Sequence, residues 1–253
     1  MRNNILSNIF SIFVLTALVF IACNQNGSAD DVSADVNKES QGASGDSAKQ
    51  SVLSKLFKKV ADEAKVNKGQ KEPDNTQYGL KDTVFKIIKD DKNKTYDEDT
   101  NEDTRHKFYG SLSWKEATIK GLGEVLAKLA GEATYKDTWP KNLVDVGAKV
   151  QGVIQVAFGD IETKKDNLNT LSLEKINELN GKVKELEEAR TTWTTFVTDL
   201  IKDYKADTGS IKTTVKNLVD NYLTPKYNDS LSGLITSSEK LGEDIGKILE
   251  DVK

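Results

Sequence analysis

A run of apolar side chains between residues 176 and 204, with alternating spacings of three and four residues, most constrains the fold of this 253-residue chain. This is the heptad pattern of a helix that packs against other helices along its length. Roughly 29 residues would form a helix about 43 Å long at about 1.5 Å per residue. The positions are Ile176, Leu179, Val183, Leu186, Arg190, Trp193, Val197, Leu200 and Tyr204.

Arg190 is the charged residue within this heptad pattern. Its long side chain could reach solvent from the edge of the core, or pair with an acid nearby. The alternative is that Arg190 gives specificity to a contact between two helices. The pattern leaves both interpretations open.

The other apolar residues after residue 49 also repeat with a helical period, and no segment alternates as a strand would. We therefore predict an all-α fold, a bundle of six or seven amphipathic helices in a single domain at residues 50–253. The long heptad segments could pack within the chain or form part of a homodimer interface. The other stripes are Leu53, Leu56, Phe57, Val60 and Ala64; Leu80, Val84, Ile87 and Ile88; Thr118, Leu122, Val125, Leu126 and Leu129; Leu143, Val146, Val150, Val153, Ile154, Ala157 and Ile161; Ile211, Val215, Leu218 and Tyr222; and Tyr227, Leu231, Leu234, Ser238, Leu241, Ile245, Ile248 and Val252.

A few residues predict where helices begin and end. Ser113 and Glu116 have the spacing of a capping box, and Pro140 suits the first turn of a helix. Gly209 suits the left-handed position that follows a helix. The short helix after it should stop before Pro225, because proline lacks the backbone N–H.

The first 22 residues have the layout of a secretory signal peptide. Arg2 supplies a positive charge, an apolar run extends from Ile5 to Ala22, and Cys23 follows directly. The run is short for a membrane span of about 20 residues. We predict a signal peptide at residues 1–22 and lipid attachment at Cys23. The alternative is a retained N-terminal anchor with an incidental cysteine.

Residues 24–49 are rich in Asn, Gly, Ser, Ala and Asp and contain no aromatic residue. Such a segment buries too little apolar surface to offset the entropy of ordering it. We predict that residues 23–49 comprise the lipidated cysteine and a flexible, disordered tether. The tether would span about 25–30 Å between the membrane and the helical domain.

The composition excludes several classes of protein. One cysteine allows no disulfide within the chain, and one cysteine with one histidine allows no Cys/His zinc site. The 40 acidic and 36 basic residues give a net charge of −4, which does not favour nucleic-acid binding. His106 has no nucleophile or oriented base to serve, and no catalytic or nucleotide-binding motif is present. We therefore predict no enzyme activity, no catalytic residue, no metal and no cofactor.

The most acidic segment is the loop from Asp90 to Arg105. Its residues 97–101 resemble the start of a calcium-binding loop, but Glu102 replaces the required glycine and Phe108 the final glutamate. We predict a solvated acidic loop, with weak divalent-cation binding as the alternative. The three tryptophans lie on or near apolar stripes, which favours places in the core: Trp114, Trp139 and Trp193.

Phe20–Cys23 resembles a bacterial lipobox in its spirochaetal form, with Phe20 where leucine is usual. Together with the tether, the predominance of lysine over arginine and the stretch from Glu185 to Tyr204, the chain is similar to outer-surface lipoproteins of Borrelia. It resembles their helical plasmid-encoded surface antigens, the S2 antigen and the CspA-like group.

This resemblance implies a surface antigen anchored in the outer membrane by acyl chains such as palmitate on Cys23. It implies non-catalytic binding of host or tick proteins, with complement regulators as partners and a role in virulence through immune evasion. The many surface lysines could also bind plasminogen. Asn24, where a retention signal would have aspartate, favours export to the cell surface. The alternative is a periplasm-facing structural or chaperone-like lipoprotein.

Overall fold

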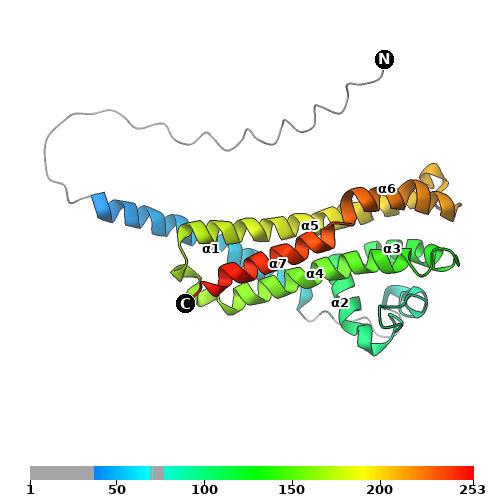
Figure 1. Ribbon diagram of the computed structural model, residues 1–253, viewed down its shortest axis with the longest axis horizontal. Coiled ribbons are helices and arrows are strands. Elements are labelled where there is room, and N and C mark those ends of the chain that lie inside the picture. The colour runs from blue at the N-terminus through cyan, green and yellow to red at the C-terminus, as the bar shows by residue number, and fades with distance from the viewer. Residues whose placement is uncertain (1–36, 69, 71–76) are drawn as a thin grey trace, which may run out of the picture. The chain divides into compact units, whose positions relative to one another are not determined.

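The computed structural model describes residues 37–68, 70 and 77–253. The chain divides into two compact units, Met1–Gln41 and Gly42–Lys253, and nearly all described residues belong to the second. Within these residues there are seven α-helices and no strand, so the predicted all-α class is confirmed. Figure 1 labels the helices: α1 (Asn37–Asn67), α2 (Glu102–Ser111), α3 (Glu116–Ala130), α4 (Trp139–Thr163), α5 (Leu173–Lys205), α6 (Thr224–Lys226) and α7 (Leu234–Glu250).

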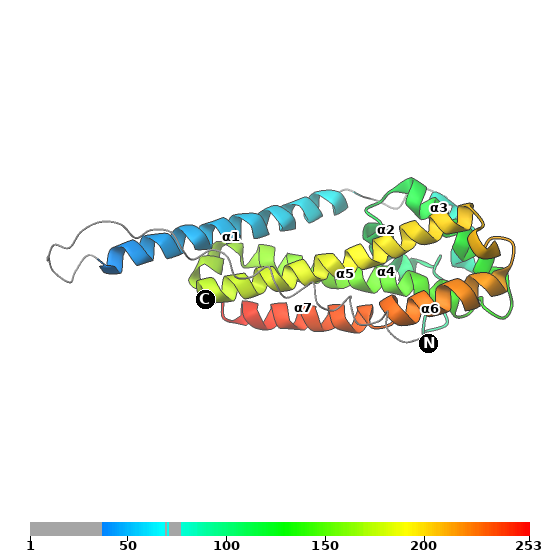
Figure 2. The same cartoon turned by 90° about the horizontal axis from the view of Figure 1, so that it is seen from above.

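The long helices α4, α5 and α7 run alongside one another, as Figures 1 and 2 show from two directions. α3 also packs on α5, and the short α2 packs on α4. Between these helices lie two clusters of buried apolar side chains. One includes residues of α2, α3 and the segment 211–231, and the other includes residues of α1 and α7.

The predicted heptad pattern lies on α5, which begins at Leu173 and ends at Lys205. Every apolar residue of the pattern is buried, from Ile176 to Tyr204. The Ser172 hydroxyl accepts a hydrogen bond from the backbone N–H of Lys175 at 3.2 Å and caps the first turn. The helix is therefore stabilised mainly by burial of one continuous face.

The prediction for Gly209 is confirmed, and the prediction for Pro225 is wrong. Gly209 has the predicted left-handed backbone, with φ of 63°. Pro225 does not stop the helix before it, as predicted, but lies in the first turn of α6. Wider π-helical turns flank α6 on both sides, at Asn217–Leu223 and Tyr227–Leu231. We infer that these wider turns accommodate the proline ring and its missing N–H.

The predicted capping box is not formed. Ser113 and Trp114 both have left-handed backbones, with φ of 54° and 56°, and Lys115 occupies the N-cap of α3 without a side-chain hydrogen bond. The backbone N–H of Trp114 bonds back to Tyr109, so Ser113 belongs to the turn that ends α2. The turn that ends α2 therefore determines the conformation of Ser113, and Ser113 cannot cap α3.

The stripe at residues 80–88 does not form the expected α-helix. Leu80, Val84 and Ile88 are buried as predicted, but Val84–Lys86 is a single 3₁₀ turn and Ile87 is exposed. The carbonyls of Ile88 and Phe85 accept N–H groups from the loop that follows, which stops helical pairing.

The start of the helical part also differs from the prediction. α1 begins at Asn37, within the segment predicted to be tether, and not at residue 50. Residues 37–49 contain lysine, glutamate, glutamine and alanine, which favour helix. Such residues can extend a helix backward from a packed turn, here the turn around Leu53.

Candidate functional site

Cys23 and the signal peptide at residues 1–22 lie outside the described residues, as does the tether up to residue 36. The predicted lipidation site therefore stays a prediction. Within the described residues, none of the helices is long and apolar enough to cross a membrane.

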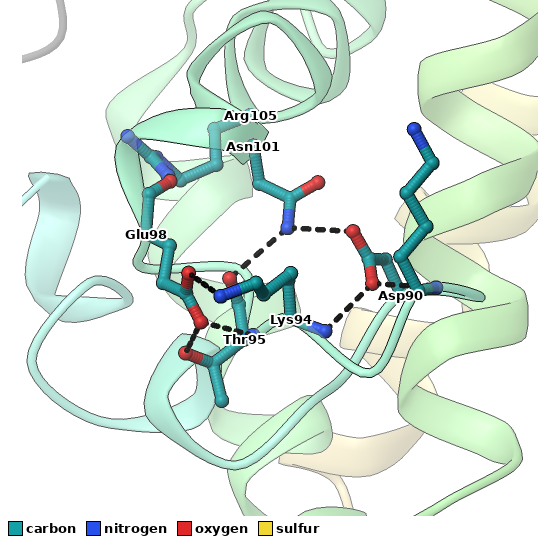
Figure 3. Close-up of polar contacts among 7 residues, drawn as sticks. Asp90, Lys94, Thr95, Glu98, Asn101 and Arg105 are labelled. Carbon is teal, nitrogen blue, oxygen red and sulfur yellow. Dashed lines mark hydrogen bonds and ion pairs between the residues drawn. The ribbon is translucent and has the colours of Figure 1, made fainter.

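The acidic loop is folded around Asp90. The Asp90 carboxylate accepts backbone N–H groups from Lys92 at 2.9 Å and Lys94 at 2.8 Å, and the Asn101 side chain at 3.1 Å (Figure 3). Partial burial opposes ionisation, but these donors outweigh it and lower the pKa of Asp90 below its ordinary value. A short bridge between Lys89 and Thr95 closes the turn.

Arg105 holds the second half of the loop from α2. Its side chain is 1% exposed, and Nη1 donates to the carbonyl oxygens of Tyr96 at 2.5 Å and Glu98 at 2.7 Å. Figure 3 shows Arg105 next to Glu98 and Asn101. Many residues of the loop are exposed to solvent, as predicted, and its fold is fixed by the buried Arg105 side chain.

Tyr96 fastens the loop to α4. Its hydroxyl donates to the Asp145 carboxylate at 2.6 Å, and both burial and this negative charge raise the pKa of Tyr96. Lys141, one turn earlier on α4, binds Asp145 at 2.5 Å and Asp91 at 3.1 Å. Burial alone would lower the pKa of Lys141, but the two carboxylates outweigh it and raise the pKa.

Beside this contact lies a pocket of about 930 Å³, which is the candidate site. The loop and α2 form one wall, and α4 and α7 form the other. The apolar side chains are on α4, and the α7 wall is acidic. The residues used below are Lys149, Val153 and Val156 of α4, and Glu239, Gly242 and Glu243 of α7.

α4 and α7 approach each other closely at Gly242. A Cβ atom placed there would lie 2.8 Å from Cγ1 of Val153, closer than packed side chains allow. The glycine therefore permits the contact that forms this side of the pocket. Val156, one turn further along α4, is 64% exposed.

Arg190 pairs with Glu63 of α1 at 2.5 Å. The other Glu63 oxygen accepts from Gln151 of α4 at 2.7 Å and from Asn67 at 2.9 Å. Both interpretations of Arg190 thus have support: it is locally paired, and the pair joins two helices of the same chain. This network lies apart from the pocket and stabilises the position of α1.

His106 and the three tryptophans contact other residues of the fold and lie outside the pocket. His106 contacts the ring of Trp114 at 4.7 Å between centroids and the carbonyl oxygen of Gln70 at 3.2 Å. Trp114 and Trp193 are buried and Trp139 is partly buried, so the predicted core positions are confirmed. In the part of the chain that the structure describes, no cluster of three acidic, histidine or cysteine side chains could hold a metal.

Sequence reasoning missed the α4–α7 pocket. Val153 was expected in a core stripe, and nothing in the sequence places residues 239–243 next to residues 149–156. The helical spacing does place the α4 residues of the pocket on one face of the helix. These residues are Lys149, Gly152, Val153 and Val156.

The fold and this pocket define a small helical domain with a shaped, charged surface. The sequence profile of the family described as Borrelia Bbcrasp-1 domain containing protein matches residues 66–250, and the chain belongs to this family. The predicted resemblance to an outer-surface lipoprotein of Borrelia is thereby confirmed. A search of curated protein sequences found no significant match.

Solved structures with the same fold come from Borrelia. The BSA64 protein of Borrelia spielmanii has a TM-score of 0.70 and 23% identity, covering 81% of this chain and 96% of its own. The outer surface lipoprotein BBA64 of Borrelia burgdorferi has a TM-score of 0.68 and 21% identity, covering 85% and 98%. The Lyme disease associated outer surface protein BBA65 of the same species has a TM-score of 0.64 and 22% identity, covering 78% of this chain and 99% of its own.

Proposed function

We propose that this chain is a non-catalytic outer-surface lipoprotein, anchored through a lipid on Cys23, that binds host or tick proteins with its helical body. The observation that carries the proposal is membership of the Borrelia family, whose profile covers residues 66–250. The structural neighbours BBA64 and BBA65 are named as an outer surface lipoprotein and an outer surface protein, which supports a surface location.

The structure supports a binding role through the pocket between the acidic loop, α4 and α7. Its volume of about 930 Å³ and its mixed apolar and charged lining suit contact with part of another protein. The loop wall is fixed by Asp90, Tyr96 and Arg105, so little ordering cost arises when a partner binds.

Capture from biological fluids tests the proposal. The mature chain with Cys23→Ala, which cannot carry a lipid, is immobilised and incubated with human serum or tick salivary-gland extract. Bound proteins are identified by mass spectrometry and compared with beads that carry albumin. Complement regulators and plasminogen are the first partners to check by purified-component binding. Specific capture is expected, and its absence from both fluids would contradict the binding role.

A further inference from the structure

Among the large hydrophobic side chains that are exposed in the described residues, Val156 is the most exposed. Its 64% exposure compares with 42% for Ile87 and 37% for Val66, and of these three only Val156 lines the pocket. An isolated exposed valine is ordinary, but Val156 continues the apolar surface of Val153 into a concave site. The pocket therefore offers a place for an aliphatic side chain of a partner.

Most charges on the loop side of the pocket are already paired. Lys94 binds Glu98, Lys107 binds Asp103, and Lys141 binds both Asp145 and Asp91. The Lys92 charge acts on Asp90, whose pKa it helps to lower. These groups are neutralised within the protein and leave little net field for a partner.

The α7 wall differs from the loop wall. Glu239 and Glu243 are exposed, lie four residues apart on one face of α7, and form no ion pair with any described residue. Lys149 of α4 and Lys92 of the loop are the lysines of the lining that form no ion pair with a described residue. The lining has six carboxylates and five lysines, so the excess charge is negative, and the two unpaired carboxylates place it on α7.

We propose that the groove between α4 and α7 binds a basic, aliphatic peptide segment of a partner protein, with its aliphatic side chain on Val153 and Val156 and its lysine or arginine against Glu239 and Glu243. The proposal rests on the proposed function and specifies where and by which chemistry the partner binds. The close packing at Gly242 fixes the two helices before binding, so the groove is pre-formed.

A labelled peptide of alternating leucine and lysine serves as the probe, and its leucine–glutamate counterpart serves as the opposite-charge comparison. Fluorescence anisotropy measures the Kd for the unlipidated mature chain. We expect the lysine peptide to bind and the glutamate peptide to bind at least about tenfold more weakly. Rising salt should weaken the binding of the lysine peptide, because salt screens the solvated charges at the rim of the groove. Equal binding of both peptides would overturn the proposal.

Matched variants locate the binding. Val156→Asp, and separately Glu239→Gln with Glu243→Gln, should each raise the Kd of the lysine peptide about tenfold or more. The controls are Ile87→Asp, an exposed hydrophobic outside the groove, and Glu132→Gln with Glu174→Gln, exposed acids outside the groove. The Kd of the lysine peptide for each control variant should stay within about twofold of its value for the parent chain. All these side chains are exposed, and circular dichroism melts check that each variant folds.

The same variants in the capture experiment separate this inference from the proposed function. If the parent chain captures a partner and the groove variants capture it equally well, the groove proposal is wrong and the binding role stands. If the parent captures nothing while peptide binding depends on the groove, the binding role fails and the groove chemistry stands.

Discussion

Glu63 is a carboxylate of α1 that is only 7% exposed, and Arg190 of α5 supplies its counter-charge. The hydrogen bonds from Gln151 and Asn67 reach one oxygen of Glu63, and Arg190 reaches the other. A buried carboxylate is tolerated only when both its charge and its hydrogen-bonding capacity are met. This network therefore joins α1 to α4 and α5 through polar contacts, beside the buried apolar side chains of α1.

Removal of one partner should cost more than removal of both. Arg190→Ala leaves the Glu63 carboxylate without its counter-charge, and we expect the free energy of unfolding to fall by roughly 3 kcal/mol. Arg190→Met with Glu63→Leu should recover most of that loss, because it removes the buried charge as well. Urea denaturation followed by tryptophan fluorescence measures both. Equal losses in the single and double variants would show that the ion pair is unimportant.

Asp90 gives the acidic loop a dependence on pH. Its pKa is lowered in the folded state, so its carboxylate stabilises the protein above the unfolded pKa of about 3.9. That stability is lost as the pH falls through the lower folded pKa. Compared with the parent, Asp90→Asn should be less stable at neutral pH, and the difference should shrink below about pH 4. Denaturation at a series of pH values measures this, and a difference that is constant with pH would contradict it.

At the scale of elements, the sequence predicted helices best where burial alone determines them. The heptad pattern placed α5 because its apolar residues, from Ile176 to Tyr204, face one core. Predictions failed where local backbone pairing decides the structure. Ser113 is in a left-handed turn, and Pro225 lies between π turns. The carbonyl oxygens of Phe85 and Ile88 accept hydrogen bonds from backbone N–H groups of the loop.

Two glycines of α4 make a matched test of helix packing. A Cβ at Gly147 would lie 2.7 Å from Oγ of Ser111 and 3.0 Å from the ring of Trp193, whereas nothing lies within 4 Å at Gly159. Gly147→Ala should therefore lower the free energy of unfolding by about 1–3 kcal/mol. Gly159→Ala should raise it by about 0.5–1 kcal/mol, because alanine favours the helix. Thermal or urea unfolding measures the stability of both variants. A change of the same sign in the free energy of unfolding for both would contradict the close packing at Gly147.

At the scale of the whole molecule, the class and family were predictable from the sequence and the pocket was not. The N-terminal pattern around Cys23 and the helical repeats pointed to a helical lipoprotein, because each signal is local. The pocket depends on α7 lying against α4, although Gly242 and Val153 are 89 residues apart in the chain, and on the close approach that Gly242 allows. Such contacts follow from packing of the complete domain, which no local pattern records.

Lipid attachment makes a prediction for the intact protein. Several acyl chains on Cys23 would hold the protein in a membrane, since each buried CH₂ contributes about 0.8 kcal/mol. In cells, Cys23→Ala should move the protein from the detergent phase to the aqueous phase of a Triton X-114 partition. Cys23→Ala that stays in the detergent phase would indicate a different anchor, such as a retained N-terminal segment.

The proposed function requires that the helical body lies outside the cell and is available to host and tick proteins. Brief proteinase K treatment of intact cells, followed by immunoblotting, measures whether the helical body is exposed. A periplasmic protein serves as the control for membrane integrity. We expect this chain to be degraded on intact cells while the control survives. Survival of the chain until the cells are lysed would contradict the claim and favour a periplasm-facing lipoprotein.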